Sequence, residues 1–217
     1  MIWQFRDRRD AGRQLARKLE AYAGREDVLV LALPRGGVPV GYEVAHALGV
    51  AFDVLTVRKL GVPQQPELAA GAIASGGAVF LNQRVLREAG VSAAALNAVD
   101  AQERAELERR EKLYRGMRPP PDVRGRTVIV VDDGMATGAS MQAAVMALRS
   151  LLPARIVAAV PVAPADAVWR MGETADEFAC VVTSVAFYAV GQFYRDFEQV
   201  TDAEVRELLD KARKELA

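Results

Sequence analysis

Two adjacent carboxylates, followed by a turn of small residues, are the part of the sequence best suited to binding or catalysis. The stretch Val128–Ser140 is Val-Ile-Val-Val-Asp-Asp-Gly-Met-Ala-Thr-Gly-Ala-Ser. Carboxylates such as Asp132 and Asp133, placed where a strand ends, can accept hydrogen bonds from a vicinal diol such as that of a ribose. The turn after them precedes a helical pattern, so it supplies backbone N–H groups, hydroxyls and a positive helix end, which together suit a phosphate. The stretch predicts a cradle for a ribose 5-phosphate. Its phosphate-binding candidates are Ala136, Thr137, Gly138, Ala139 and Ser140.

Two further candidate motifs follow apolar runs. The run 27–33 ends in Pro34, Arg35, Gly36 and Gly37, and the run 51–57 ends in the basic pair Arg58 and Lys59. A continuous apolar run is typical of a strand buried on both faces. Ligands of open α/β sheets lie beyond the carboxyl ends of the strands. We therefore expect all three motifs at one edge of a sheet.

Apolar strands alternate with helical patterns along most of the chain. Strands are indicated at 27–33, 51–57, 127–131, 155–162 and 177–183, and helices at 8–23, 38–48 and 139–152. Alternation of this kind predicts an α/β fold with a mostly parallel central sheet flanked by helices. We expect one domain over residues 1–217, with its core at about 24–60 and 125–183.

Two segments differ from this pattern. Residues 60–77 are rich in Gly, Pro and small side chains, which predicts a flexible loop with a short strand near 71–75. Residues 92–118 are strongly charged and contain favourable (i, i+4) pairs such as Glu106 with Arg110, which predicts an exposed helical arm. For this arm a solvated face is favoured over a dimer contact.

Composition excludes several classes of protein. Of the 217 residues, 51% are hydrophobic and 26% charged, and the formal net charge is zero. Nothing in this balance indicates a nucleic-acid or anionic-membrane partner, and no apolar run reaches the ~18 residues of a membrane span. The single cysteine, Cys180, and the single histidine, His46, exclude a disulfide framework and a His-rich metal site. The N-terminus lacks the apolar core of a signal peptide, so we expect a cytoplasmic protein.

The motifs resemble those of the type I phosphoribosyltransferases. In that family four apolar residues, two acids and a Thr-Gly-x-Ser ending bind phosphoribosyl pyrophosphate (PRPP). Over residues 5–210 the sequence is similar to one bacterial group of predicted phosphoribosyltransferases, which are sometimes fused to an α/β-hydrolase domain. That similarity rests on Leu-Pro-Arg-Gly-Gly-Val-Pro-Val, Val-Arg-Lys-Leu-Gly-x-Pro-x-x-Pro-Glu-Leu-Ala, Tyr-Arg-Gly, Val-Asp-Asp-Gly-x-Ala-Thr-Gly-Ala and Ala-Val-Gly-x-Phe-Tyr-x-Asp-Phe.

The resemblance implies a fold and an activity. The fold would be of the type I phosphoribosyltransferase kind, with a small hood over the central sheet. The activity would be transfer of the 5-phosphoribosyl group of PRPP to a nucleobase-like acceptor with release of pyrophosphate. Mg²⁺ would be held mainly through PRPP and water, without a dedicated protein site.

The resemblance also implies roles for the motifs. Asp132 and Asp133 would hold the ribose diol, and the turn 136–140 the 5-phosphate. The loop Pro34–Gly37 would bind pyrophosphate, with a strained peptide bond expected near Pro34–Gly36. The basic pair Arg58 and Lys59 would close over it, in a catalytic loop with Glu67. Glu67 is equally compatible with an acid/base role, a metal contact or an ordinary loop carboxylate.

Two departures from the family pattern bear on the acceptor. Gly134 replaces the usual aliphatic residue, and Ala136 replaces an aspartate that 6-oxopurine-transferring members place before the Thr-Gly. The missing carboxylate counts against hypoxanthine and guanine. The hood that recognises the base is expected from residues 184–200 with the N-terminal Trp3 and Phe5. Candidates for stacking on a base are Phe187, Tyr188, Phe193 and Tyr194. An equally favoured alternative is that these rings fill the core beneath the hood.

Two other classes of function stay open. One is a regulator that senses PRPP or a nucleotide without catalysis, and the other is a hydrolase with water as acceptor. The long loop and the basic pair favour an enzyme, while the zero net charge disfavours a DNA-binding regulator. Whether the chain is a monomer or a homodimer, and which base it would use, is not determined by the sequence.

Overall fold

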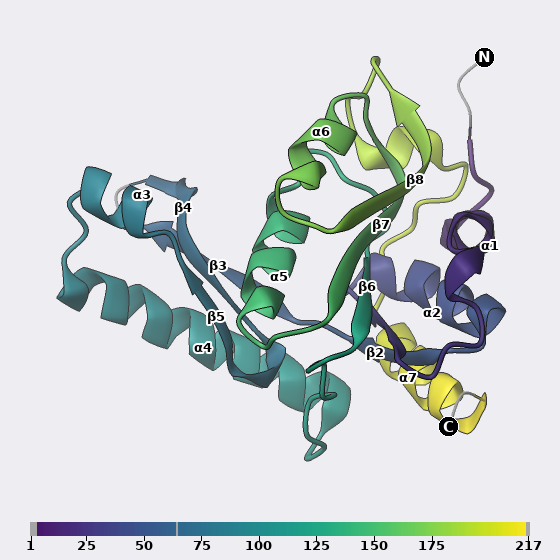
Figure 1. Cartoon of the computed structure of the whole chain (residues 1–217), viewed down its shortest axis with the longest axis horizontal. Coiled ribbons are helices and arrows are strands. Elements are labelled where there is room, and N and C mark those ends of the chain that lie inside the picture. Colours follow the sequence, from purple (N-terminus) through teal and green to yellow (C-terminus); the bar gives the residue numbers. More distant parts are fainter. Residues whose placement is uncertain (1–3, 64, 216–217) are drawn as a thin grey trace.

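A five-stranded parallel sheet forms the centre of the molecule (Figure 1). The computed structural model describes residues 4–63 and 65–215, apart from the side chains of Pro66 and Glu67. The strand order is β2-β1-β6-β7-β8, and all neighbouring strands are parallel. The strands are β1 (Val28–Ala32), β2 (Ala51–Val54), β6 (Thr127–Val131), β7 (Arg155–Pro164) and β8 (Glu177–Ser184). The predicted α/β fold with a mostly parallel sheet is confirmed.

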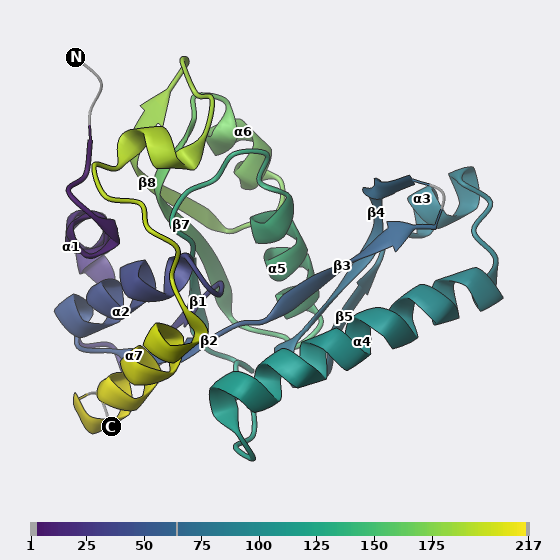
Figure 2. The ribbon, with the colours of Figure 1, turned by 180° about the vertical axis from the view of Figure 1, so that it is seen from behind.

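Helices cover both faces of this sheet (Figures 1 and 2). They are α1 (Arg8–Lys18), α2 (Gly37–Leu48), α5 (Ala139–Arg149) and α6 (Ala167–Gly172). Side chains of successive strand residues point to opposite faces: Leu29 and Leu31 pack on the side of α5 and α6, and Val28 and Val30 on the side of α1 and α2. A further helix, α7 (Asp202–Glu215), packs beside α2 and β2.

A separate three-stranded antiparallel sheet projects to one side of the core (Figure 2). Its strands are β3 (Val57–Val62), β4 (Gln65–Ala74) and β5 (Ala78–Leu81), followed by the short helix α3 (Gln83–Glu88) and the long helix α4 (Ala93–Arg115). Leu60 and Ile73 of this sheet bury against Leu107 of α4. The opposite face packs on α5, so this sheet joins α4 to the core.

Two sequence predictions in this region are wrong. The second strand ends at Val54 rather than Val57, and Arg58 and Lys59 lie inside β3 instead of following a strand of the central sheet. Residues 60–70, predicted as a flexible loop, belong mostly to β3 and β4. Their Gly- and Pro-rich composition favours a loop locally, but burial against α4, a distant segment of the chain, stabilises the strands.

The charged helix is present as predicted, but it is not a free arm. Leu107 and Tyr114 are buried, and the side chain of Arg115 is only 3% exposed. Arg115 donates a 3.1 Å hydrogen bond to Asp53 and another to the carbonyl oxygen of Val54, where β2 ends. The C-terminal half of α4 is therefore fixed to the edge of the central sheet.

The hood segment 184–200 is mostly irregular and contains a short 3₁₀ helix, Val190–Phe193. The N-terminal segment joins it, because the Phe5 N–H donates to the Phe193 carbonyl at 2.8 Å and the Arg195 N–H donates to the Phe5 carbonyl at 2.9 Å. Trp3, which the sequence also assigned to the hood, lies outside the described residues.

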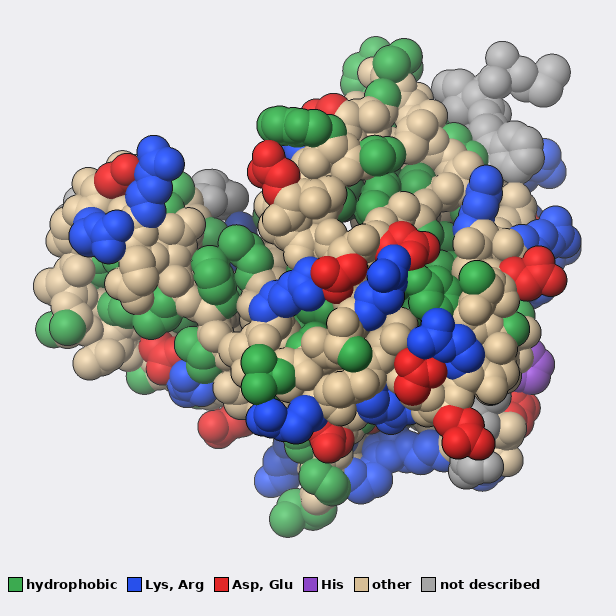
Figure 3. All heavy atoms as spheres, in the orientation of Figure 1, with side chains coloured by type: hydrophobic (Ala, Val, Ile, Leu, Met, Phe, Trp, Pro, Cys, Tyr) green, Lys and Arg blue, Asp and Glu red, His purple; other side chains and the backbone are tan. Residues whose placement is uncertain are grey.

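Acidic and basic side chains are mixed over the face seen in Figure 3, with no broad area of one sign. Within the described ranges, no helix has both the length and the apolar character needed to cross a membrane.

Candidate active site

Two of the predicted motifs meet where the order of the strands reverses. β1 and β6 are parallel neighbours with Ala32 opposite Val131, so the loops that follow them leave the sheet side by side. The chain continues from β1 to β2 on one side, and β6 begins the other half of the sheet. Such a switch point is where open α/β sheets bind ligands.

Glycines allow the first of these loops to touch the acid pair. A Cβ atom on Gly36 would overlap the Asp133 carboxylate, and one on Gly37 would lie 2.7 Å from the Val131 carbonyl oxygen. The peptide bond between Pro34 and Arg35 is cis, and it lies within the stretch where the resemblance implies a strained peptide bond. The loop 34–37 therefore lies directly against the two carboxylates.

The two adjacent aspartates are partly buried, and this burial disfavours their ionised forms. Asp132 accepts a 2.8 Å hydrogen bond from the backbone N–H of Asp133. Burial, together with the neighbouring carboxylate, raises the pKa of Asp132 well above its ordinary value. Burial also raises the pKa of Asp133, although the nearby Arg8 guanidinium opposes the shift. Carboxyl groups with raised pKa values beside a cavity mark a candidate functional site.

Arg8 is a partner of the acid pair that the sequence did not reveal. Its Nε donates to Asp133 Oδ2 at 2.8 Å, and its Nη1 donates to the Glu198 carbonyl at 2.6 Å. The guanidinium lies 3.9 Å from the centre of the Phe197 ring. Arg8 thus connects the start of α1, the hood segment and Asp133. No local pattern could identify this role, since Arg8 and Asp133 are 125 positions apart.

The predicted phosphate turn begins α5. Gly138 takes the left-handed conformation with φ 80°, which glycine adopts readily, and the helix follows at Ala139. Thr137 and Ser140 are exposed, while the Thr137 carbonyl accepts a 3.0 Å hydrogen bond from Arg170 of α6. Arg170 therefore anchors the backbone of the turn, while the hydroxyl side chains of Thr137 and Ser140 lie at the surface.

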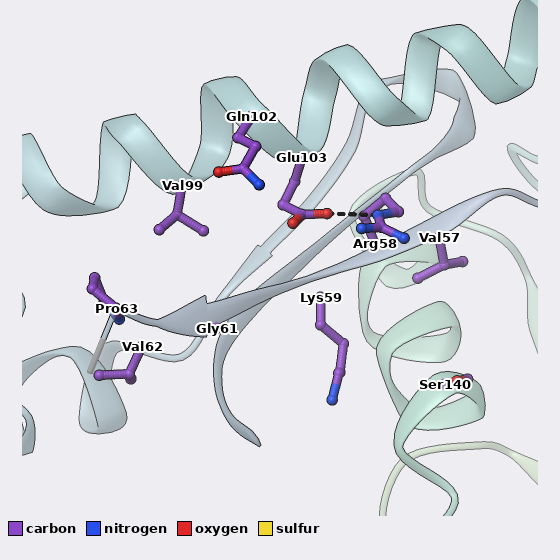
Figure 4. Close-up of a pocket in the computed structure, with 10 residues that line it drawn as sticks. All are labelled: Val57, Arg58, Lys59, Gly61, Val62, Pro63, Val99, Gln102, Glu103 and Ser140. Atoms are coloured by element: carbon purple, nitrogen blue, oxygen red, sulfur yellow. Dashed lines mark hydrogen bonds and ion pairs between the residues drawn. The ribbon is translucent and has the colours of Figure 1, made fainter. Parts of the chain in front are cut away.

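One cavity brings the predicted motifs together. It has a volume of about 220 Å³, and its wall includes Pro34, Arg58, Asp132 and Ser140. Thr56 and Arg110, which the sequence did not single out, also line it. A larger cleft of about 460 Å³ shares Val57, Arg58 and Ser140 with it and runs between β3 and α4 (Figure 4).

The basic pair divides between the two sides of β3. Arg58 Nε is 2.5 Å from Glu103 Oε2 of α4, whereas Lys59 points away from α4 (Figure 4). Both residues line the larger cleft. Glu67 lies on β4, but its side chain is outside the described part of the structure.

The aromatic residues of the hood divide into two groups. Phe193 and Tyr194 are buried, at 2% and 4% exposure, and pack with Phe5 and Val162. Their rings are not accessible for stacking, so the alternative that they fill the core applies to these two. Phe187 is half-buried, with its ring centre 5.2 Å from that of Phe193. Tyr188 is 89% exposed.

The hood also contacts the central motif. The Tyr194 hydroxyl donates to the Asp133 carbonyl oxygen. A Cβ atom on Gly134 would lie 2.5 Å from Cγ1 of Val190. The glycine at this position, a departure from the family pattern, therefore makes room for the hood.

The fold and the cavity define an α/β protein with a candidate ligand site at the switch point of its parallel sheet. Residues 4–196 match the model of the phosphoribosyl transferase domain family. The chain therefore belongs to that family.

Proteins of similar sequence and structure agree with this family membership. Two proteins from Mycobacterium tuberculosis, provisionally named phosphoribosyl transferases, are 48% identical over 213 residues, which cover 98% of this chain and 48% of each relative. The chain thus spans about half the length of these two relatives. The crystal structure of the protein TT1426 from Thermus thermophilus is similar at a TM-score of 0.88 and 44% identity, covering 96% of this chain and 98% of that chain.

Proposed function

We propose that the chain transfers the 5-phosphoribosyl group of PRPP to a nucleobase-like acceptor and releases pyrophosphate. The observation that carries this proposal is the cavity of about 220 Å³ lined by Pro34, Arg58, Asp132 and Ser140. These residues come from the motifs that the sequence associates with pyrophosphate, ribose and 5-phosphate. Binding one PRPP molecule requires all of these parts within one cavity.

The ribose phosphate would be held by the motif after β6. Asp132 and Asp133 accept hydrogen bonds from the ribose hydroxyls, and Arg8, which donates to Asp133 at 2.8 Å, orients that carboxylate. Backbone N–H groups and hydroxyls of residues 137–140 bind the 5-phosphate at the N-terminus of α5.

The pyrophosphate would be held by the loop after β1 and by the basic pair. Glycines 36 and 37 let backbone N–H groups approach its oxygens. Arg35 and Arg58 supply positive charge, and Lys59 closes over it from β3. Cations fixed before the reaction stabilise negative charge as it develops on the leaving group, which lowers the barrier.

The acid pair also fits a magnesium ion bound with the substrate. Mg²⁺, when bound, would neutralise pyrophosphate oxygens. One or two carboxylates are enough for Mg²⁺ when substrate oxygens and water complete its ligand shell. In the described part of the chain, no three or more His, Cys, Asp and Glu side chains cluster closely enough to hold a metal. Asp132 and Asp133 would therefore contribute as a pair, beside the substrate's own ligands.

The acceptor in this proposal is not a 6-oxopurine. Ala136 is exposed in the phosphate turn and brings no carboxylate to a base. Tyr188 and the half-buried Phe187 are the stacking candidates whose rings an acceptor could reach.

Pyrophosphate release in the presence of PRPP, Mg²⁺ and a panel of bases tests the activity. Release that depends on one base supports the transferase, and release without any base supports a ribosyl-phosphate hydrolase. Tight PRPP binding without release would point to a sensing protein.

A paired variant tests the cradle itself. Asp132→Asn with Asp133→Asn should abolish PRPP binding measured by calorimetry while the circular dichroism spectrum is unchanged. Asp122→Asn is the control, because Asp122 lies outside the cavity. Unchanged PRPP affinity in the double variant would refute the assignment of the acid pair.

A further inference from the structure

Helix α4 forms a wall of the candidate active site. Its Glu103 pairs with Arg58, and its Tyr114 hydroxyl donates to Asp202 of α7 at 2.7 Å. Leu107 is buried in the apolar contact with β3 and β4, and Arg115 binds the end of β2. These contacts lie on both sides of Arg110 in the sequence, so the position of Arg110 is fixed by its helix.

Arg110 reaches the cavity that Asp132 and Ser140 line. Its Nε donates to Glu106 Oε1 at 2.7 Å, and its side chain is 34% exposed. Its two terminal nitrogens have no hydrogen-bond partner among the described residues. Arg110 therefore offers the cavity two donor nitrogens and a positive charge that is only partly neutralised.

Thr56 adds an independent sign of a ligand at the same place. It is 3% exposed, and its hydroxyl is buried without a hydrogen-bond partner in the described structure. Buried hydroxyls are almost always paired, so an unpaired one in a cavity wall needs an explanation. Thr56 lies two residues before Arg58 and lines the cavity together with Arg110.

The charges in this cavity define what would fill it. Arg58 and Arg110 each pair through Nε with a glutamate of α4, Glu103 and Glu106, and each keeps terminal nitrogens that can still donate. The wall also contains the Thr56 hydroxyl and the Asp132 carboxylate. A ligand with several closely spaced anionic oxygens would satisfy all three donors at once. A diphosphate group has this chemistry, whereas the 5-phosphate already has its own turn at 136–140.

We propose that Arg110 is a binding residue for the pyrophosphate group of PRPP, supplied by α4 of the same chain, and that the Thr56 hydroxyl donates to an oxygen of that group. This inference rests on the proposed function. It assigns a task to the charged helix, which the sequence left without one.

Helix α4 contains a matched control. Arg109 and Arg110 both contact Glu106 at 2.7 Å. Arg109 is 62% exposed and does not line the cavity. The variants Arg110→Gln and Arg109→Gln remove the same charge from adjacent helical positions, and each removes a partner of Glu106. Of the two arginines, Arg110 is the one that lines the cavity.

Calorimetry with pyrophosphate, PRPP and ribose 5-phosphate tests the assignment. For Arg110→Gln we expect the Kd of pyrophosphate and of PRPP to rise roughly 10- to 100-fold, the loss typical of one charged hydrogen bond. Ribose 5-phosphate should bind as to the unchanged chain, and Arg109→Gln should alter none of the three. Thr56→Val should weaken pyrophosphate binding about 3- to 10-fold.

Several outcomes would overturn the assignment. The first is that Arg110→Gln and Arg109→Gln have equal effects. The second is that Arg110→Gln weakens ribose 5-phosphate binding as much as pyrophosphate binding. The third is that the unchanged chain binds ribose 5-phosphate but not pyrophosphate. If the unchanged chain binds PRPP and Arg110→Gln binds it equally well, the inference fails while the proposed function stands. If the unchanged chain does not bind PRPP, both fail.

Discussion

Asp132 is the residue at which stability and ligand binding conflict most directly. Its carboxylate lies in a low-polarity position beside a second carboxylate, and both burial and that neighbour raise its pKa. Ionising it therefore costs free energy in the folded chain that is not spent in the unfolded chain. A ligand with hydroxyl donors or a bound cation would compensate for that cost.

The free-energy cost of ionising Asp132 in the folded chain predicts a stabilising substitution. Because the pKa of Asp132 is raised above its ordinary value of 3.8, the folded state holds more protons than the unfolded state as pH rises from there, and stability falls. Asp132→Asn cannot ionise, so its Tm should exceed that of the unchanged chain at pH 8 and match it near pH 3.8. Thermal unfolding across this range measures the difference. A lower Tm for the variant at pH 8 would contradict the raised pKa.

Arg8 is predicted to stabilise the folded chain, because it pairs with the nearly buried carboxylate of Asp133. Its side chain is 12% exposed and that of Asp133 15%, so removing the cation leaves a nearly buried carboxylate without its charged partner. We expect Arg8→Gln to lower the free energy of unfolding by about 3 kcal/mol, and Asp133→Asn in that background to restore part of it. Urea denaturation measures both.

A nearby exposed pair provides the control for Arg8. Arg6 pairs with Asp7 at 3.3 Å, but the Arg6 side chain is 69% exposed. Arg6→Gln should change the free energy of unfolding by less than ~0.5 kcal/mol. Similar losses in the two variants would mean that burial of the Arg8–Asp133 pair does not set its importance.

At the scale of elements, the hood and the central motif fit together through a glycine. A Cβ atom at Gly134 would lie 2.5 Å from Val190 Cγ1 and 3.0 Å from Val162 Cγ1. The loop after β6 and the 3₁₀ helix of the hood therefore pack without room for one more methyl group. This contact couples the predicted ribose site to the segment expected to face the acceptor.

The contact predicts a compensating pair of substitutions. Gly134→Ala should lower the free energy of unfolding by about 1–3 kcal/mol through overpacking. Val190→Ala opens space at the same point, so the double variant should be more stable than the sum of the single effects predicts. Chemical denaturation of the four proteins completes the cycle. Strict additivity would show that the two residues do not compete for space.

On the scale of the whole molecule, the cavity wall brings together segments from distant parts of the sequence. The wall draws on the ends of β1, β2 and β6, on β3 and α4, and on the start of α5. Segments that are distant in sequence meet because the small antiparallel sheet packs between α4 and α5.

This arrangement predicts PRPP binding that is independent of self-association. Calorimetry at two protein concentrations about tenfold apart should give the same Kd and one site per chain, whether or not the chain forms the homodimer that the sequence left open. Sedimentation at the same concentrations reports the oligomeric state. Affinity that rises with the fraction of dimer would show that a partner contributes to the site.

The sequence by itself determined the central fold and the two motifs at its switch point. A continuous apolar run predicts a strand buried on both faces, and this pattern can be recognised locally. The residue types of the turns Pro34–Gly37 and Asp132–Ser140 can likewise be recognised without knowledge of the rest of the fold. The resemblance implied a strained peptide bond near Pro34–Gly36, and the bond between Pro34 and Arg35 in that stretch is cis.

Tertiary structure decided what surrounds those motifs. Residues 60–70 favour a loop locally, yet most of them belong to β3 and β4, and these strands pack between α4 and α5. Arg8, Thr56 and Arg110 join the site region only through folding, since no spacing links them to Asp132 or Asp133. Phe193 and Tyr194 become core for the same reason. Local patterns specify strands and turns, whereas partners distant in sequence are selected by the packing of the whole chain.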